Sequence, residues 1–245
     1  MREPRVYTDQ TLEPGLRVRL DSATGRHLIK VLRLRPNAPL RLFNGDGREL
    51  QGRLSDVSGS RVTATIEALT GSEPEPPLQL NLLLGVSKGE RMDFAIRKAV
   101  ELGVTGISPL FAARSMVRLQ GERLQRRTAH WHGLVVSACE QSGRCRLPRL
   151  APPQPLTTAM EESAGDLRLL LYHRGDNGLQ RLAAPQRGID LLVGPEGGLE
   201  AAEIRLARER GFVPVRLGPR IMRTETAPLA ALAAIQMLWG DFRGS

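Results

Sequence analysis

A proline-rich break divides this sequence into two stretches with different hydrophobic patterns. The break, residues 71–77 (GSEPEPP), has three prolines and no other apolar side chain. Such a composition resists both helix and central strand, and is typical of a stiff linker. We therefore expect a first domain of residues 1–72, a linker of residues 73–77 and a second domain of residues 78–245.

Before the break, apolar and polar residues alternate over short runs. Residues 16–20 and 61–66 alternate with a period of two, and residues 40–43 lead into the turn-forming sequence at 44–47 (NGDG). A period of two is typical of half-buried strands, and asparagine and glycine favour the tight turns that join them. The first domain is expected to be a small β-rich unit in the form of a barrel.

After the break, continuous apolar runs alternate with segments of helical periodicity. We expect strands at 78–86, 104–111, 167–172, 189–193 and 213–217, and helices around 92–100, 121–141, 200–210 and 226–240. Ser87 and Glu90 have the spacing of a capping box before the first helix. Buried parallel strands fit these runs, so residues 78–245 should form an α/β sheet with helices on both faces. Threaded chains are rare, so periodicity alone predicts an ordinary doubly wound sheet.

The chain is basic, and its positive charge is concentrated in two segments. It has 35 Lys and Arg residues against 26 Asp and Glu, a formal net charge of +9, and all but three of the basic residues are arginines. Residues 17–41 hold seven basic residues and one acidic residue, and residues 112–149 hold eight and two. Either segment alone is equally consistent with a solvated face, but two in different domains favour a nucleic acid held across the domain junction.

Several other classes of protein are disfavoured. The N-terminus lacks the apolar stretch of a signal peptide and no run approaches the ~18 apolar residues of a membrane span, so we expect a soluble, cytoplasmic protein with no membrane partner. Cys139 and Cys145 are the two cysteines, and we expect both to be reduced. Together with His130 and His132 they match no zinc spacing, so no metal is expected.

A glycine-rich loop, residues 194–199 (GPEGGL), carries the sharpest local signal for a ligand. It follows an apolar strand and precedes a helix, the place where parallel sheets bind ligands. It lacks both the Lys-Ser/Thr ending of a phosphate loop and the G-x-G-x-x-G spacing of dinucleotide folds, which disfavours a dinucleotide oxidoreductase. Glu196 would repel phosphate but suits ribose hydroxyls or a cationic ligand. A simple strand-to-helix turn remains the alternative.

A second loop, residues 217–227 (LGPRIMRTETA), has the same place in the pattern. It combines arginines and a glutamate with two threonines, of which Thr224 or Thr226 is expected to be the N-cap of the next helix, with Pro228 in its first turn. Charged groups at such a junction present a site to a polar ligand. Helix capping plus a local Arg–Glu pair is the alternative.

These two loops resemble the last two signature motifs of the SPOUT methyltransferases. The N-terminal Arg5-Val6-Tyr7, residues 88–93 (KGERMD), 98–103 (KAVELG) and 140–142 (EQS) are similar to the bacterial small-subunit ribosomal RNA uridine-N3 methyltransferase family. Residues 27–33 (HLIKVLR) and 43–47 (FNGDG) resemble the signature of the PUA-like N-terminal barrel of that family. The similarity covers nearly the whole chain.

The resemblance implies a SPOUT-type trefoil-knotted α/β domain with a parallel sheet, preceded by a small PUA-like β-barrel. It further implies S-adenosyl-L-methionine (SAM) as methyl donor, a homodimer, and methylation of N3 of uridine 1498 in 16S rRNA of the 30S subunit. A 2′-O-ribose methyltransferase of the same superfamily and a non-catalytic RNA-binding assembly factor are the alternatives. By resemblance the cofactor lies bent in the knot, against Leu171, Tyr172, His173, Gly194, Glu196, Gly197, Gly198, Leu217, Gly218, Ile221 and Met222.

The chemistry of uridine N3 defines two further groups of candidate residues. Loss of the N3 proton leaves negative charge on the ring, so a cation is needed beside the base. We expect Arg223 to stabilise that charge or orient the base, and Glu225 to hold Arg223 or relay the proton. N3 lies on the Watson–Crick edge, so the base must be unpaired or flipped out. The residues expected to contact RNA are Arg5, Arg33, Arg114 and Arg144.

Overall fold

The computed structural model describes residues 3–58, 61–117 and 119–243, which divide into two compact units. Unit 1 extends to residue 75 and also contains residues 139–147, whereas unit 2 contains residues 76–138 and the chain from residue 148 onward. The expected basic segment 112–149 is therefore shared between the units. Arg118, one of its basic residues, lies outside the described residues.

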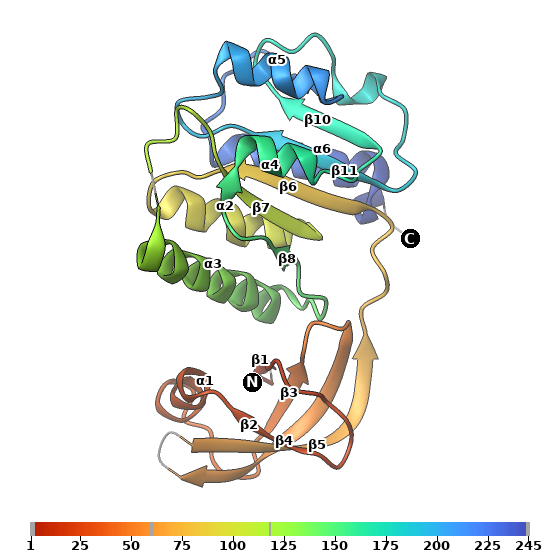
Figure 1. Ribbon diagram of the computed structural model, residues 1–245. Helices are drawn as coiled ribbons and strands as arrows, with labels where there is room; N and C mark the ends of the chain where they lie inside the picture. Colours follow the sequence, from red (N-terminus) through yellow and green to blue (C-terminus); the bar gives the residue numbers. More distant parts are fainter. Residues whose placement is uncertain (1–2, 59–60, 118, 244–245) are drawn as a thin grey trace. The chain divides into compact units, whose positions relative to one another are not determined.

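Unit 1 contains a five-stranded sheet with the order β1-β3-β4-β5-β2 (Figure 1). Strands β1 and β3 are parallel, and the other neighbours are antiparallel. The predicted strands correspond to β2, β3 and β5, whereas β1 and β4 were not predicted. The elements are β1 (Arg5–Tyr7), β2 (Arg17–Leu20), α1 (Ser22–Arg26), a π-helical turn (His27–Val31), β3 (Pro39–Phe43), β4 (Arg48–Ser58) and β5 (Arg61–Ser72).

The five strands of unit 1 enclose one hydrophobic core. In β5, Val62, Ala64 and Ile66 are buried, which is every second residue, as the alternation predicted. They pack in the same cluster as Leu28, from the π-helical turn. The pairing of β4 with β5 has three register irregularities, and such bulges bend a long hairpin around its core.

Unit 2 is built on a parallel sheet with the order β12-β10-β11-β6-β7-β8, and β9 also pairs with β7. All of these pairings are parallel, which confirms the expected α/β class. The short elements β8, β9 and α4 were not predicted. The elements are β6 (Gln79–Gly85), α2 (Glu90–Glu101), β7 (Gly106–Phe111), α3 (Gly121–Ser142), β8 (Arg149–Leu150), β9 (Gln154–Pro155), α4 (Leu156–Glu161), β10 (Leu167–Leu171), β11 (Gly188–Val193), α5 (Ala201–Glu209), β12 (Val213–Val215) and α6 (Thr226–Trp239), with short 3₁₀ turns at Leu179–Arg181 and Asp241–Arg243.

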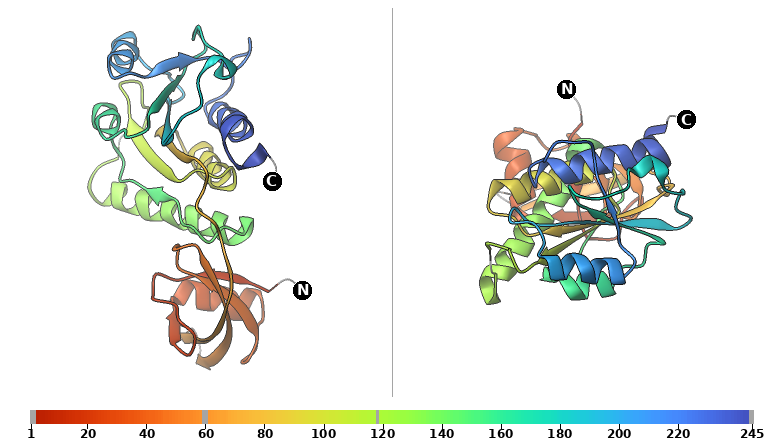
Figure 2. Two further views of the ribbon diagram at one scale, coloured as in Figure 1. Left: turned by 90° about the vertical axis from the view of Figure 1, so that its right-hand side faces the viewer. Right: turned by 90° about the horizontal axis from the view of Figure 1, so that it is seen from above.

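Helices cover both faces of this sheet, as expected (Figure 2). Helices α2 and α6 lie on one face, and α4 and α5 lie on the other. Leu83 and Leu192, from β6 and β11, pack with Met160 of α4 and Ala207 of α5. All six residues of β11 are buried, because side chains alternate between faces and both faces are covered.

Two helix starts differ from the expected ones. Helix α2 begins after Gly89, which has φ +60°, so the capping-box prediction for Ser87 was wrong. The N-cap of α6 is Glu225, without a side-chain cap, and Pro228 lies in the first turn as expected. Thr224 instead donates its hydroxyl to the carbonyl of Gly194 at 3.1 Å. Thr224 therefore connects the loops at 217–227 and 194–199 instead of capping α6.

Neither a membrane span nor a metal cluster is found in the described chain. Within residues 3–58, 61–117 and 119–243, no helix is both long and apolar enough to cross a bilayer. Over the same ranges, no three His, Cys, Asp or Glu side chains are grouped to hold a metal ion.

Candidate functional site

Three loops meet at one edge of the sheet of unit 2. Strands β12, β10 and β11 are adjacent and parallel, so their carboxyl ends lie at the same edge. The segments that follow these strands surround a cavity of about 490 Å³. This volume lies in the range of about 300–1,000 Å³ that is usual for small-molecule sites. The cavity thus lies at the edge of the sheet where the glycine loops predicted a ligand site.

The cavity brings together most of the predicted cofactor residues. Ten of the eleven line it, whereas Gly218 borders a neighbouring hollow together with residues 176–181 and Met237. Their contact with a cofactor remains a prediction. The ten are Leu171, Tyr172, His173, Gly194, Glu196, Gly197, Gly198, Leu217, Ile221 and Met222.

Glu196 presents a buried acceptor to the cavity. Its Oε1 accepts the backbone N–H of Lys88 at 2.9 Å and lies 3.5 Å from Arg91 Nη1. Its Oε2 is buried and has no hydrogen-bond partner in the described part of the chain. A buried carboxylate oxygen is costly without a partner, so this atom suits a ligand that carries O–H, N–H or positive charge.

The glycines around Glu196 allow close backbone approach. A Cβ on Gly197 would lie 2.8 Å from Cβ of Arg114, and a Cβ on Gly85, at the end of β6, would lie 2.3 Å from the nitrogen of Pro195. Gly198 has φ +69°, which a side chain would strain. The loop can pack this closely because these residues have no side chains, and that close packing fixes Glu196 beside the cavity.

The proposed catalytic pair lies beside the cavity rather than in its lining. Arg223 is exposed, and its carbonyl accepts from the N–H groups of Thr226 and Ala227 at 2.9 Å each. Glu225 has a buried Oε2 with no described partner. Thr224, between them, does line the cavity. No ion pair between Arg223 and Glu225 is found among the described residues, so here Glu225 does not hold Arg223.

Four arginines reach the cavity, and three of them were not among the site residues named from the sequence, although Arg220 belongs to the loop at 217–227 that was expected to meet a polar ligand. Arg114, an expected RNA contact, lines it together with Arg174, Arg216 and Arg220. The three missed residues each follow the end of β10 or β12 by no more than five positions. That position, at the carboxyl end of a parallel strand, is the signal that could have identified them.

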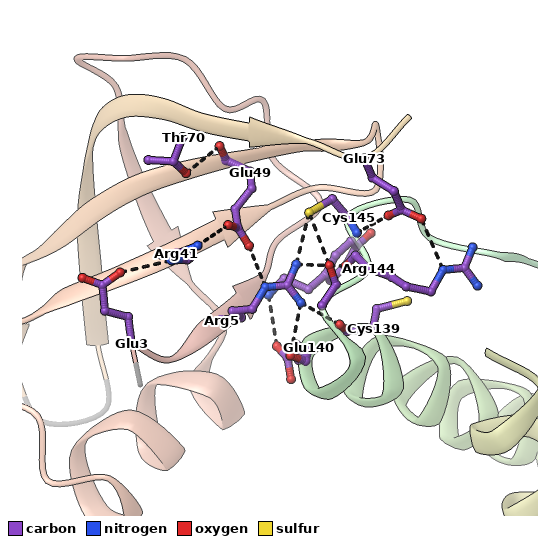
Figure 3. Close-up of polar contacts among 12 residues, drawn as sticks. Glu3, Arg5, Arg41, Glu49, Thr70, Glu73, Cys139, Glu140, Arg144 and Cys145 are labelled. Carbon is purple, nitrogen blue, oxygen red and sulfur yellow. Dashed lines mark hydrogen bonds and ion pairs between the residues drawn. The ribbon is translucent and has the colours of Figure 1, made fainter. Parts of the chain in front are cut away.

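Arg5 has a structural role in unit 1, which corrects its assignment to RNA (Figure 3). Its side chain is only 6% exposed, and its Nε donates to Glu49 Oε1 at 2.6 Å. Its Nη1 donates to the carbonyl of Cys139 at 2.7 Å, and its Nη2 donates to that of Arg144 at 3.1 Å. The guanidinium also lies 4.9 Å from the centroid of the Phe43 ring. With its donors used in this way, Arg5 is not available to a phosphate.

The carboxylate that faces Arg5 is held in its charged form. Burial alone would raise the pKa of Glu49, but hydrogen bonds from Arg5 and Arg41 outweigh burial and lower it. Arg41 Nη1 lies 2.7 Å from the other carboxylate oxygen of Glu49. Arg5, Glu49 and Arg41 therefore form a connected charged cluster on β1, β3 and β4.

Glu73, expected in the linker, fastens residues 139–147 within unit 1. Its Oε2 accepts the N–H groups of Cys145 and Arg146, the latter at 2.7 Å, and its Oε1 lies 3.5 Å from Arg144 Nε (Figure 3). Arg144 is 13% exposed, so it too is largely held by the protein. Of the four expected RNA contacts, Arg33 and Arg114 are the exposed ones.

The His and Cys residues that were weighed as zinc ligands do not form a metal-binding group among the described residues. His130 Nε2 lies 2.7 Å from Asp93 Oδ2. Cys139 and Cys145 are free and buried, and burial raises the pKa of Cys139 to about 12. A protonated thiol is a poor metal ligand.

Comparison with known proteins extends over both units. The family described as "RNA methyltransferase domain" matches residues 74–236, and that described as "RNA methyltransferase PUA domain" matches residues 20–67. A curated ribosomal RNA small subunit methyltransferase E from Synechocystis is 34% identical, over 95% of this chain and 76% of its own. The corresponding protein of Buchnera aphidicola from Schizaphis graminum is 30% identical, over 98% of each chain.

Solved structures give the same result in three dimensions. A ribosomal RNA small subunit methyltransferase E from Neisseria gonorrhoeae, bound to SAM, is 42% identical with a TM-score of 0.93 over 98% of this chain and all of its own. A structure from Legionella pneumophila with bound SAM is 35% identical, with a TM-score of 0.94 and the same coverage. Both units thus share the fold of these structures, a SPOUT-type α/β domain and a PUA-like domain. The chain belongs to the RNA methyltransferase family that includes the ribosomal RNA small subunit methyltransferases E.

Proposed function

We propose that this protein transfers a methyl group from SAM to N3 of uridine 1498 in 16S rRNA. The observation that carries the proposal is the cavity at the carboxyl ends of β10, β11 and β12, in a chain similar over 98% of its length to a SAM-bound small-subunit rRNA methyltransferase. The position and atom of methylation rest on the resemblance of the sequence motifs to the uridine-N3 family.

The residues around the cavity fit SAM. SAM supplies an electrophilic methyl group on a positively charged sulfur. The buried, unpartnered Oε2 of Glu196 suits the hydroxyl or ammonium groups of such a ligand, and the glycines at 194, 197 and 198 leave the loop backbone accessible. Leu171, Ile221 and Met222 add apolar surface, and Ile221 is 82% exposed.

Arg223 and Glu225 are proposed to act on the uridine. The exposed guanidinium of Arg223 would stabilise the negative charge that develops on the ring oxygens as the N3 proton is lost. Glu225, with its unpartnered buried Oε2, would accept or relay that proton. Because N3 lies on the Watson–Crick edge, the uridine must be presented unpaired.

The partners are proposed to be the 30S subunit and a second copy of this chain, in the cytoplasm. Exposed arginines of both units, such as Arg33 and Arg114, support binding of RNA. Two large apolar side chains border hollows of unit 2: Ile221, 82% exposed, lines the cavity, and Met237, 58% exposed, lines the neighbouring hollow. Their exposure is costly in a monomer. Light scattering of the wild type and of Met237→Glu tests the proposed dimer. A dimeric wild type with a monomeric variant would support an interface that includes Met237.

Incubation with SAM and 30S subunits lacking the modification, followed by nucleoside mass spectrometry, tests the activity. We expect 3-methyluridine among the nucleosides, and mass spectrometry of oligonucleotide fragments of the same rRNA should locate it at position 1498. Comparison with naked 16S rRNA shows whether the assembled subunit is needed. A methyl group on the ribose would identify the 2′-O-methyltransferase alternative. Binding of RNA without binding of SAM, measured by calorimetry, would identify a non-catalytic assembly factor.

A further inference from the structure

We propose that the arginines lining the cavity form a phosphate-binding rim, which holds the RNA backbone beside the target nucleotide. The rim consists of Arg114, Arg174, Arg216 and Arg220. The inference deepens the proposed function and rests on it, because it takes RNA as the substrate. It gives a specific ligand to Arg220, which lies in the loop at 217–227, and a role to Arg174 and Arg216, which lie outside the motifs.

The four side chains converge from three loops. Arg114 follows β7, Arg174 follows β10, and Arg216 and Arg220 follow β12. All four residues are exposed. Like charges that gather around one hollow repel each other, so the arrangement favours a site whose ligand is an anion.

The rim arginines are largely unpaired within the protein. For Arg174, Arg216 and Arg220, the structure of the described residues contains no ion pair or side-chain hydrogen bond. Arg114 makes only long contacts, 3.8 Å from Glu200 and 3.4 Å to the carbonyl of Gly197. The guanidinium groups therefore keep their donors for a ligand, and each can grip a phosphate through two parallel hydrogen bonds.

The cofactor does not account for this charge. SAM carries a sulfonium and an ammonium group against one carboxylate, so its net charge is positive. Glu196 is the one acidic residue that lines the described cavity, and it already lies near Arg91. Four arginines around a cationic cofactor would weaken its binding unless a second, anionic ligand shares the site. RNA phosphates supply that charge.

Arg187 provides a matched control within the same unit. It is also exposed, and its side chain has no ion pair or hydrogen bond in the described part of the chain. It directly precedes β11, so it lies at the amino edge of the parallel sheet, whereas the cavity lies at the carboxyl edge. If any exposed arginine of this basic chain served equally well, Arg187 would behave like the rim.

The test measures RNA and SAM binding separately. Binding of a small-subunit rRNA fragment that contains the target uridine is followed by fluorescence anisotropy from about 0.05 to 0.3 M salt, for Arg174→Gln, Arg216→Gln, Arg220→Gln and Arg187→Gln. Each rim substitution should make the negative slope of log K against log salt less steep by about 0.7, and should weaken RNA binding several-fold. Arg187→Gln should leave slope and affinity unchanged. Arg216 also borders the hollow that contains Asp176, so its effect should be the smallest of the three.

Calorimetry with SAM distinguishes the two ligands and reports folding of the site. Rim variants should bind SAM as well as the wild type, or slightly more tightly, since positive charge has been removed. An unchanged salt slope in all rim variants overturns the rim, and so does a tenfold loss of SAM affinity, which would assign the arginines to the carboxylate of the cofactor. These binding measurements require no methyl transfer, so the rim and the proposed function can fail separately. If the wild type binds RNA through these residues but does not methylate 30S subunits, the proposed function is refuted and the rim is not.

Discussion

Arginine plays opposite parts in the two units of this protein. In unit 1, Arg5 is 6% exposed and gives its donors to Glu49 and to main-chain carbonyls. In unit 2, Arg174 and Arg220 are exposed at a cavity and have no ion pair or side-chain hydrogen bond among the described residues. Net charge does not distinguish the two cases. Burial and satisfied donors mark a structural arginine, whereas convergence of unpaired guanidiniums marks a binding one.

The largest effect is expected on removing the buried arginine. Arg5→Ala leaves Glu49, which is 12% exposed, without one of its two charged partners and removes the side-chain hydrogen bonds to three main-chain carbonyls. We expect loss of about 3 kcal/mol of stability in unit 1, because breaking a buried pair leaves an uncompensated charge. Hydrogen-exchange protection of β3 and β4 measures it.

Arg41→Ala is the matched control, because Arg41 contacts the same carboxylate but its side chain is 44% exposed. An exposed ion pair contributes about 1 kcal/mol or less. SAM affinity should not change in either variant, since the cavity belongs to unit 2. If the two variants lost equal protection, Arg5 would not be the structural centre of the cluster.

The exposed Arg223 tests the other side of the comparison. Arg223→Ala should leave the fold and SAM affinity unchanged, because the Arg223 side chain makes no ion pair or hydrogen bond in the described chain. It should lower the methylation rate by about 10² or more, as for loss of an oxyanion donor. Single-turnover methylation of 30S subunits measures this, with Arg187→Ala as control. A decrease of less than a few-fold would remove Arg223 from the mechanism.

The main strands could be predicted because each is a continuous or alternating apolar run. β10 and β11 were found in this way, whereas β8 and β9 have two residues each and carry no periodic signal. β1 forms through parallel pairing with β3, more than thirty residues later, so no local pattern reveals it. Residues 139–147 belong to unit 1 because of contacts to Arg5 and Glu73, which are tertiary and cannot be derived from periodicity.

The candidate site, like the fold, could be predicted from the sequence only in part. The glycine loops mark the ends of β11 and β12, but strand order decides which loops meet, and the order β12-β10-β11 is not sequential. Arg174 and Arg216 lie outside any motif and become meaningful only when that order is known. Conversely, Arg5 lies in a family motif, yet burial rather than motif membership determines its role.

Glu196 is the acidic counterpart of the rim, and its change should have an intermediate effect. Glu196→Gln keeps the shape but removes the charge, while the N–H of Lys88 retains an acceptor. We expect SAM affinity to fall about tenfold, since hydrogen bonds to charged groups contribute about 1.5–3 kcal/mol. Calorimetry with the uncharged-sulfur product S-adenosylhomocysteine in parallel separates loss of attraction to the sulfonium from loss of a hydrogen bond. An unchanged affinity for both would exclude Glu196 as a cofactor ligand.

The smallest expected effect is a pH dependence within unit 1, where two glutamates have opposite shifts. The pKa of Glu49 is lowered, since the hydrogen bonds from Arg5 and Arg41 outweigh burial, so its contribution to stability is present above its ordinary value near 4.5 and is lost as pH falls through the folded-state pKa. Burial raises the pKa of Glu140, so its contribution is present below that value and is lost as pH rises through its folded-state pKa.

Substitution of each glutamate separates the two contributions. Glu49→Gln should reduce the loss of hydrogen-exchange protection between pH 7 and pH 3.5 in β3 and β4, because the residue that favours neutral pH is gone. Glu140→Gln should increase that loss, because the residue that favours acid is gone. The sign therefore differs between two carboxylates that both contact β1, Glu49 through the side chain of Arg5 and Glu140 through the N–H of Tyr7. Equal pH profiles for the two variants would show that the charged cluster around Arg5 does not control the acid stability of unit 1.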